Sequence, residues 1–371
     1  MQNISLIMQN IGHIIIHVAR KSCKMNKTKR ITIIHTKETT MKKFIAIALA
    51  ALMILSFAGC GEKKSTKTNL ELVSTLDQAI LSLAAGKCDA VALDGTTAQN
   101  YVNQSDGAFA MTGINFDLTM YGIHEGNVAA AKKGETSLIE AVNKILTVAT
   151  TTPSGHVPEG YTDTYYTWWV AQAKIQSGTE DESAIAIVGD YDVFEGKDNP
   201  DEDFNYLLDT SELEKPTLDL SKASGVLKSV LDKGVLTIAT SPDYPAAEWI
   251  DDKGVIWGSE MMMAKYIADC LGVKLQIETM DFSAVLTAVD TGKVDMAMSG
   301  FGWKEDREQS FELSIGYVGD DDVSFHTLIV PAKTKDQYKE LKDFQGKHIL
   351  AQAGSLQQMY VEDQILCFDE K

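Results

Sequence analysis

Two segments of this chain repeat one pattern, and that pattern limits the folds open to it. Residues 83–95 read LAAGKCDAVALDG, and residues 288–300 read AVDTGKVDMAMSG. Each predicts a helix that ends at a glycine, which suits a left-handed C-cap, and then a short apolar strand that ends at a second glycine. Short apolar strands that follow helices are typical of buried parallel sheets. Both segments therefore predict helix-to-strand crossovers of an α/β fold.

The same alternation continues through the rest of the chain. Apolar residues predict strands at 235–239 and 273–277, and helical spacing relates Met263, Ile267 and Leu271 as well as Leu138, Val142 and Ile145. Residues 161–175 predict a terminal aromatic helix. Residues 187–224 are acidic and rich in turn-forming residues, which predicts either a linker or a poorly ordered excursion.

The charge of the chain is unevenly distributed. The net charge is −18, yet residues 1–60 carry nine Lys or Arg and one acidic residue. The acidic remainder argues against nucleic-acid binding, which needs a basic surface. The five cysteines are odd in number and form no CxxC pair, so the sequence predicts neither a metal site nor a disulfide framework, and no cofactor is expected.

Residues 41–60 have the order of a signal peptide. A basic start, MKK, precedes the uncharged run FIAIALAALMILSF, which is shorter than the roughly 18 residues of a membrane span. The following AGC resembles a bacterial lipobox and predicts lipidation of Cys60, although Phe57 stands where Leu is usual. The alternative is a buried apolar helix with an incidental cysteine. Residues 1–40 are predicted to be an upstream leader that is not native, with Met41 as the start, or else an unusually long basic region of the signal peptide.

The C-terminal part of the chain resembles a known family. The stretch GVLTIATSPDYPAAEW at 234–249, followed by VSFHTLIVPA and KDFQGKHILAQAGSLQQ, resembles the bacterial extracellular solute-binding proteins of family 3, which bind polar amino acids. The parts that the family places next occur earlier here, as LVSTLDQAILSLAAGKCDAVALDG at 72–95 and NVAAAKKGETSLIEAVNKIL at 127–146. The resemblance covers nearly all of residues 70–175 and 225–365.

The resemblance implies a two-lobed α/β fold of the periplasmic-binding-protein type. Two hinge strands would join the lobes, which close over a ligand. The fold would be circularly permuted or assembled from two partial copies. The expected divisions are the leader 1–40, the signal peptide 41–60, a tether 61–69, the C-terminal half of the binding domain 70–186, the acidic linker 187–224 and the N-terminal half 225–371.

The resemblance also implies a ligand site. Arg307 matches the family arginine that binds the α-carboxylate, which a guanidinium can hold with two hydrogen bonds. Asp94 matches the acid that receives the α-amino group, and Tyr244 and Phe282 match aromatic residues that flank the ligand side chain. Without the resemblance, Arg307 is a solvated residue at a helix start and Asp94 a common turn residue.

Two short turns complete the implied site. They contribute Ser299, Gly300, Gly302, Ser355, Leu356 and Gln357. Residues 355–357 are expected to open a helix whose backbone N–H groups add to carboxylate binding. Gly302 and Leu356 both depart from the hydroxyl residues that are usual in the family, which puts the number of hydrogen bonds to the ligand in doubt.

The resemblance implies an extracytoplasmic, lipid-anchored component of an ABC importer. Its partners would be an amino acid, the transporter permease and, through the lipid, the membrane. A non-functional gene fragment is an alternative because the chain stops in the middle of a lobe. An enzyme on the same fold, similar to a dehydratase, is a further alternative, although no GxSxG, HExxH or phosphate loop is present. The sequence does not fix which amino acid is bound.

Overall fold

The computed structural model describes residues 67–121, 126–179, 181–189, 191–193, 200–317 and 325–370. Lys63–Lys371 form one compact unit. The predicted leader, signal peptide and Cys60 lie outside the described residues. Within the described part, no helix combines the length and the apolar character needed to cross a membrane.

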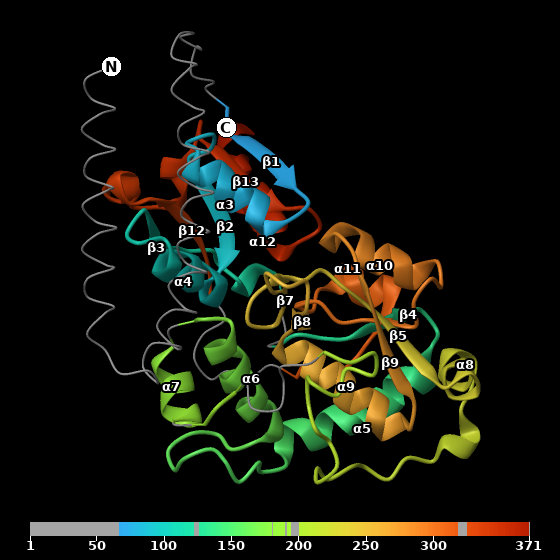
Figure 1. The fold of residues 1–371 in the computed structure, drawn as a ribbon. Helices are drawn as coiled ribbons and strands as arrows, with labels where there is room; N and C mark the ends of the chain where they lie inside the picture. The colour runs from blue at the N-terminus through green and yellow to red at the C-terminus, as the bar shows by residue number, and fades with distance from the viewer. Residues whose placement is uncertain are drawn as a thin grey trace, which may run out of the picture. The chain divides into compact units, whose positions relative to one another are not determined.

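The first five-stranded sheet has the strand order β1-β13-β2-β12-β3. Together with the helices on its faces it is called lobe 2 here. β13 pairs in parallel with β1 and β2, whereas β12 runs antiparallel to β2 and β3. In Figure 1, blue and cyan strands from early in the chain alternate with red strands from its end. The strands are β1 (Asn69–Val73), β2 (Ala90–Asp94), β3 (Phe109–Asn115), β12 (His326–Pro331) and β13 (His348–Gln352).

The second five-stranded sheet has the order β11-β4-β10-β5-β9 and forms, with its helices, lobe 1. β5 pairs in parallel with β9 and β10, and β4 pairs antiparallel with β10 and β11. A small antiparallel sheet, β6-β7-β8, follows β5. The strands of lobe 1 are β4 (Ala130–Lys132), β5 (Val235–Thr240), β6 (Asp243–Tyr244), β7 (Glu248–Ile250), β8 (Ile256–Trp257), β9 (Lys274–Thr279), β10 (Met296–Ala297) and β11 (Phe311–Leu313).

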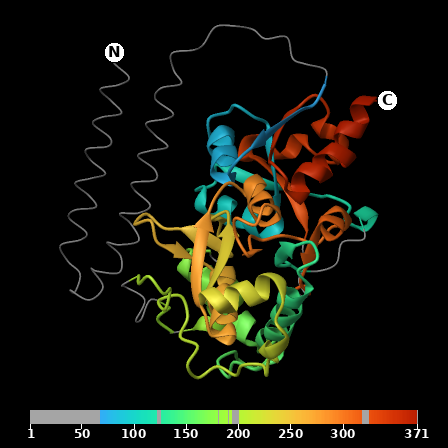
Figure 2. The same ribbon diagram turned by 90° about the vertical axis from the view of Figure 1, so that its right-hand side faces the viewer.

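Amphipathic helices cover both sheets because their apolar faces must be buried. Figures 1 and 2 show the two groups of helices. Lobe 2 holds α3 (Leu76–Ala84), α4 (Gly95–Gln104) and α12 (Leu356–Gln364). Lobe 1 holds α5 (Thr136–Thr151), α6 (Tyr165–Gln176), α7 (Glu182–Val188), α8 (Gly225–Lys233), α9 (Ser259–Leu271), α10 (Phe282–Asp290) and α11 (Glu305–Ser310).

Both predicted crossovers are present. α3 is followed by Gly86 at φ +68° and then β2, and α10 is followed by Gly292 at φ +70° and then β10. Glycine suits these positions because the left-handed region is costly for other residues. The predicted strands at 235–239 and 273–277 correspond to β5 and β9, and the aromatic helix corresponds to α6. The α/β prediction is therefore confirmed.

The two halves of the chain build both lobes together. β1, β2 and β3 lie in lobe 2 and β4 lies in lobe 1, and all four come from residues 67–186, the N-terminal half of the chain. The C-terminal half of the chain, residues 225–371, supplies the strands on either side of β2 and β4. The N–H of Thr68 donates to Asp369 Oδ2 at 2.6 Å, and the N–H of Gly346 donates to Thr68 Oγ1 at 3.0 Å. The start of β1 therefore lies beside the end of the C-terminal half.

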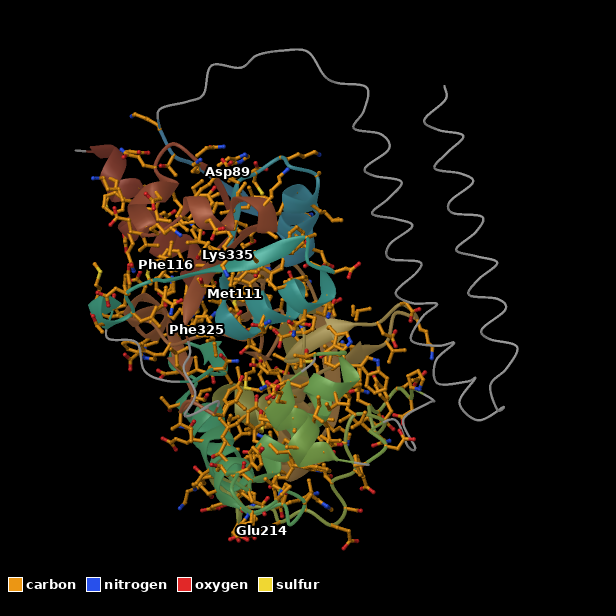
Figure 3. All side chains as sticks on the ribbon, turned by 90° about the vertical axis from the view of Figure 1, so that its left-hand side faces the viewer. Asp89, Met111, Phe116, Glu214, Phe325 and Lys335 are labelled. Carbon is orange, nitrogen blue, oxygen red and sulfur yellow. The ribbon has the colours of Figure 1, made fainter. Side chains whose placement is uncertain are left out.

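The acidic segment before α8 packs against lobe 1. Tyr206 and Leu207 are buried in the lobe 1 core, and the Tyr206 hydroxyl donates to the Ile256 carbonyl at 3.1 Å. Thr210 Oγ1 donates to Asp269 Oδ2 at 2.6 Å. Glu214 lies at the far end of lobe 1 from Phe325 (Figure 3). The few apolar residues of 200–217 thus attach this segment to lobe 1, and its role as a linker stays a prediction.

Candidate functional site at the boundary of the two lobes

Arg307 is a buried cation at the boundary between the lobes. Its side chain is 3% exposed and reaches from α11 of lobe 1 to lobe 2. Nη1 donates to the Gly302 carbonyl at 2.5 Å, and Nη2 donates to the Gly354 carbonyl of lobe 2 at 3.0 Å. Nε is buried and has no hydrogen-bond partner. In the described part of the chain, no carboxylate lies within ion-pair distance of this guanidinium.

A buried charge without a counter-ion is costly, and an anionic ligand would remove that cost. Burial lowers the pKa of Arg307 to about 10, so the guanidinium stays charged at neutral pH. Two backbone carbonyls orient the planar group and leave the Nε–H free to donate. The arrangement can therefore bind a carboxylate.

Two aromatic rings support the Arg307 side chain. Its guanidinium carbon lies 5.1 Å from the centre of the Phe301 ring, a distance at which cation–π attraction acts. The Phe282 ring lies 4.9 Å from the Phe301 ring. Phe282, which the sequence assigned to the site, thus reaches Arg307 through Phe301. Sequence reasoning missed Phe301, because a buried aromatic residue after a strand is a common core feature.

The two departures from the family pattern lie against each other. A Cβ atom at Gly302 would stand 2.7 Å from Leu356 Cδ1, so the absence of a side chain at 302 makes room for Leu356. Leu356 is 8% exposed and belongs to lobe 2, whereas Gly302 belongs to lobe 1. The two residues therefore compensate in volume, and an apolar contact occupies a place where the family pattern has hydroxyl groups.

Asp94 lies on the lobe 2 side of the same boundary. It ends β2 and caps α4, accepting a hydrogen bond from the Thr97 N–H at 2.9 Å. Burial, and then the charge of the Asp94 carboxylate, raise the pKa of Tyr244, a phenol of lobe 1. The Tyr244 ring also lies beside Gly300, where a Cβ atom would stand 3.0 Å away. Asp94, Tyr244 and Gly300 are thus brought together.

Asp94 and Arg307 do not contact each other. Asp94 of lobe 2 interacts with Tyr244 of lobe 1, and Arg307 of lobe 1 donates to the Gly354 carbonyl of lobe 2. His326, which received no role in the sequence analysis, lies opposite Asp94 in the pairing of β12 with β2. Its Nδ1 lies 2.9 Å from Gln357 Nε2, so Gln357 is connected to Asp94 through His326. Burial lowers the pKa of His326, and Asp94 acts in the opposite direction.

The remaining predicted residues have internal partners. The Ser355 side chain caps α12, as expected, by accepting from the Gln358 N–H at 3.1 Å, and it donates to the Gln352 carbonyl at 2.7 Å. Ser299 Oγ accepts from the Ser241 N–H at 2.9 Å. The side chains of Ser299 and Ser355 therefore orient the two turns.

Two buried carboxyl groups lie beneath the turn at Ser299 and Gly300. Glu260 accepts from the Gly300 N–H at 3.1 Å and from Asn127 Nδ2 at 2.7 Å. Glu248 accepts from Ser299 Oγ at 3.3 Å, and its second oxygen is buried without a partner. Burial and then the neighbouring Glu260 raise the pKa of Glu248 well above its ordinary value. Glu248 is therefore expected to be protonated in the folded protein.

We expect the Glu248→Gln variant to change the dependence of stability on pH. A carboxyl group with a raised folded pKa supports folding below its unfolded pKa, near 4.5, and this support is lost as pH rises toward the folded pKa. Between pH 5 and 7, the unfolding free energy of the native protein should therefore fall more steeply with pH than that of Glu248→Gln. Urea unfolding at both pH values measures the difference. The exposed Glu140→Gln is the matched control, and equal pH slopes for all three proteins would refute the prediction.

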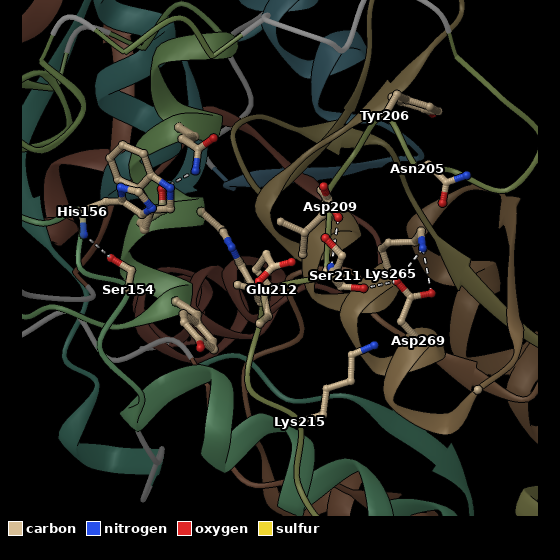
Figure 4. A pocket seen from close by; sticks show the side chains of 18 of the residues that line it. Ser154, His156, Asn205, Tyr206, Asp209, Ser211, Glu212, Lys215, Lys265 and Asp269 are labelled. Atoms are coloured by element: carbon tan, nitrogen blue, oxygen red, sulfur yellow. Dashed lines mark hydrogen bonds and ion pairs between the residues drawn. The ribbon is translucent and has the colours of Figure 1, made fainter.

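A separate cavity of about 1040 Å³ lies on lobe 1. Figure 4 shows its lining from α6, α9 and the acidic linker. Two of its three lysines have carboxylate partners, since Lys265 pairs with Asp269 at 2.5 Å and Lys274 pairs with Asp203 at 2.7 Å. None of the predicted site residues lines it. In the described residues, no group of three or more His, Cys, Asp or Glu side chains could hold a metal.

The fold and this boundary describe a two-lobed protein with a buried guanidinium where its lobes meet. Residues 236–343 match the family model of the bacterial extracellular solute-binding proteins, family 3. The probable ABC transporter extracellular-binding protein YckB of Bacillus subtilis is 33% identical over 138 residues, covering 36% of this chain and 46% of YckB. The arginine-binding protein ArgT of Corynebacterium glutamicum is 33% identical over 88 residues, covering 24% of this chain and 29% of ArgT.

Two further similar proteins are a binding protein of known structure and an enzyme. A solved amino acid ABC transporter substrate-binding protein from Streptococcus pneumoniae, bound to L-arginine, is 41% identical; the match covers 25% of this chain and 40% of that chain, with a TM-score of 0.24. The cyclohexadienyl dehydratase of Pseudomonas aeruginosa is 30% identical over 94 residues, covering 25% of this chain and 35% of the enzyme. The matches to these relatives span less than half of each relative's length. The matched part of this chain, residues 236–343, is therefore similar to the bacterial extracellular solute-binding proteins of family 3.

Proposed function

We propose that this chain is the extracytoplasmic solute-binding component of an ABC importer and that it binds a polar amino acid between its lobes. The observation that carries the proposal is Arg307, a buried cation at the lobe boundary with a free Nε–H and no carboxylate partner in the described structure. Asp94 lies on the opposite lobe and supplies a carboxylate for the α-ammonium group. Closure of the lobes would bury both charged ends of a zwitterion against opposite charges.

L-Arginine is the first ligand to test. ArgT is described as an arginine-binding protein, and the Streptococcus pneumoniae relative holds L-arginine. The lobe boundary also carries the carboxyl groups of Asp94 and Asp243 against the guanidinium of Arg307. A cationic side chain would improve that charge balance.

Isothermal titration calorimetry on purified residues 61–371 tests the proposal. We expect one ligand molecule to bind per chain when the common amino acids are titrated individually. For the amino acid that binds, the carboxyl amide and the N-acetyl form should both fail to bind, because each lacks one charged end. If no amino acid binds, or if the blocked forms bind as well as the free amino acid, the proposed site is wrong.

We further propose that the binding domain is circularly permuted. The hydrogen bond between Thr68 and Asp369 and the pairing of β1 with β13 place the end of residues 225–371 beside the start of residues 67–186. This arrangement supports a usual family order in which residues 225–371 come first and residues 67–186 follow. The packed linker at 200–217 would then join what are the two ends in the usual family order. The alternative of two partial copies would need these strand pairs to form between different chains.

The lipid anchor is also a proposal. It is supported by the order of the basic start, the apolar run and Cys60 in the sequence. Diacylation suffices for stable membrane attachment, whereas a single acyl chain does not. Metabolic labelling with a fatty acid, followed by fractionation, should place the protein with membranes, and Cys60→Ser should remove both the label and the membrane association.

The dehydratase relative keeps an enzyme as a second candidate. Its match covers only 35% of that enzyme, and the other relatives named above are described as binding proteins. The buried Glu248 and Glu260 have protein partners in the turn at Gly300, which favours a supporting role for both carboxyl groups over catalysis.

A further inference from the structure

Asp243 of lobe 1 holds two hydrogen-bond donors of lobe 2. Its Oδ2 atom accepts from the Leu76 N–H at 2.9 Å and from Gln352 Nε2 at 2.8 Å. Its Oδ1 atom accepts from Ser241 Oγ at 2.9 Å, which fixes the carboxyl group on its own lobe. Asp243 therefore bridges the two lobes through hydrogen bonds to protein groups.

The two donors on lobe 2 are well placed to hold a carboxylate. Leu76 is the first residue of α3, so its N–H lacks a partner within the helix and lies at the positive end of the helix dipole. Gln352 ends β13, and its Nε2 also donates to the Ser74 carbonyl at 3.1 Å. Hydrogen bonds from these groups to an ionised carboxylate are stronger than bonds between neutral groups.

The same contact joins both halves of the chain. Leu76 and Ser74 come from the N-terminal half, Gln352 comes from the C-terminal half, and Gln352 lies opposite Val73 in the pairing of β13 with β1. Asp243 thus touches lobe 2 where its two sequence segments meet. The donors would keep their positions in lobe 2 if the lobes separated, whereas their acceptor would leave with lobe 1.

We propose that Asp243, Leu76 N–H and Gln352 form a clasp that stabilises the closed arrangement of the lobes and is a positioning device for ligand binding. Opening would replace these hydrogen bonds with water, so the clasp sets the fraction of molecules that are closed before ligand arrives. The apparent dissociation constant equals the intrinsic constant divided by that fraction. The effect on affinity rests on the proposed function, whereas the effect on lobe closure does not.

Interlobe distances measured without ligand test the clasp. Spin labels at Leu81 of α3 and Ser229 of α8, both exposed, report the separation of the lobes in residues 61–371 after Cys88, Cys270 and Cys367 have been replaced by alanine. Pulsed electron paramagnetic resonance should show a closed population in the parent protein. Asp243→Ala should shift the distribution to longer distances.

Two further variants keep the test independent of folding defects at position 243. Gln352→Met removes one donor at nearly constant length and should open the lobes partly, while Gln352→Glu sets a second carboxylate against Asp243 and should open them further. Asp295→Ala is the matched control, because Asp295 accepts from the Thr237 N–H at 2.7 Å entirely within lobe 1. This control should leave the interlobe distances unchanged.

Calorimetry with L-arginine provides the second measurement. If the parent protein binds L-arginine, the Asp243→Ala variant should bind it at least tenfold more weakly. The loss of affinity should be proportional to the loss of the closed population. Longer distances in Asp243→Ala support the clasp even if no amino acid binds the parent, a result that would count against the proposed function alone. Identical distance distributions in parent, Asp243→Ala and Gln352→Glu would overturn the clasp, as would a parent that is fully open without ligand.

Discussion

Neither half of the binding domain is expected to fold without the other. Every strand pairing of β1, β2, β3 and β4 is to a strand of the C-terminal half. Residues 67–186 alone would therefore have four strands with no partner among themselves, and their buried apolar faces would be exposed to water. Expressed separately, residues 67–186 and 225–371 should show no cooperative unfolding transition in urea.

Restoring the usual family order should preserve the fold. A chain that runs from Leu218 to Lys371 and continues directly from Lys67 to Thr217 closes the short gap between Asp369 and Thr68, which are hydrogen-bonded at 2.6 Å. Its new ends would fall at the exposed Thr217, where a break is tolerated because few contacts are lost. We expect a monomer whose thermal midpoint lies within a few degrees of that of residues 61–371.

Size-exclusion chromatography distinguishes the permuted domain from its alternative. If the given order works only by exchanging halves between chains, residues 61–371 should form dimers and the reordered chain should form monomers. If the reordered chain fails to fold, or if residues 67–186 fold alone, the permuted-domain proposal is wrong. A monomer in both orders, with equal ligand affinity, supports it.

Local sequence patterns predicted the elements but not their contacts. The crossovers at Gly86 and Gly292 were recognised because helix ends, glycines and apolar strands follow one another within a dozen residues. The packing of Tyr206 and Leu207 was missed because two apolar residues in an acidic, turn-rich segment produce no periodic signal. Burial of this segment depends on the α6 and α9 surfaces, which lie elsewhere in the sequence.

The sequence predicted which residues form the candidate site, an assignment that stays a prediction, and it did not predict the contacts among those residues. Arg307 and Asp94 were identified by resemblance, yet the sequence does not show that Gly302 makes room for Leu356, a residue of the other lobe. Pairings of this kind depend on how two lobes meet, and no spacing rule within one element encodes them. His326 was overlooked because a single histidine in a strand is ordinary until its neighbour Asp94 is known.

Replacement of Arg307 should separate ligand binding from folding. Arg307→Met retains the bulk of the side chain and removes its charge, so a ligand carboxylate would be buried without its partner. Loss of one member of a desolvated charge pair costs on the order of 2–5 kcal/mol, and the affinity should fall roughly a hundredfold or more. Arg307→Lys should recover little, because an ammonium group cannot reproduce the planar fork.

The stability of the ligand-free variants decides between a binding role and a structural one. A guanidinium that served only to hold Gly302 and Gly354 would lower the unfolding free energy when removed. A buried cation without a carboxylate partner is itself costly, so Arg307→Met should leave the unfolding free energy within about 1 kcal/mol of the native value. Lys304→Met, which removes a neighbouring positive charge, should change affinity by less than about tenfold because a more distant, partly solvated charge contributes less. If Arg307→Met unfolds easily and still binds the ligand with native affinity, Arg307 is structural and the carboxylate site lies elsewhere.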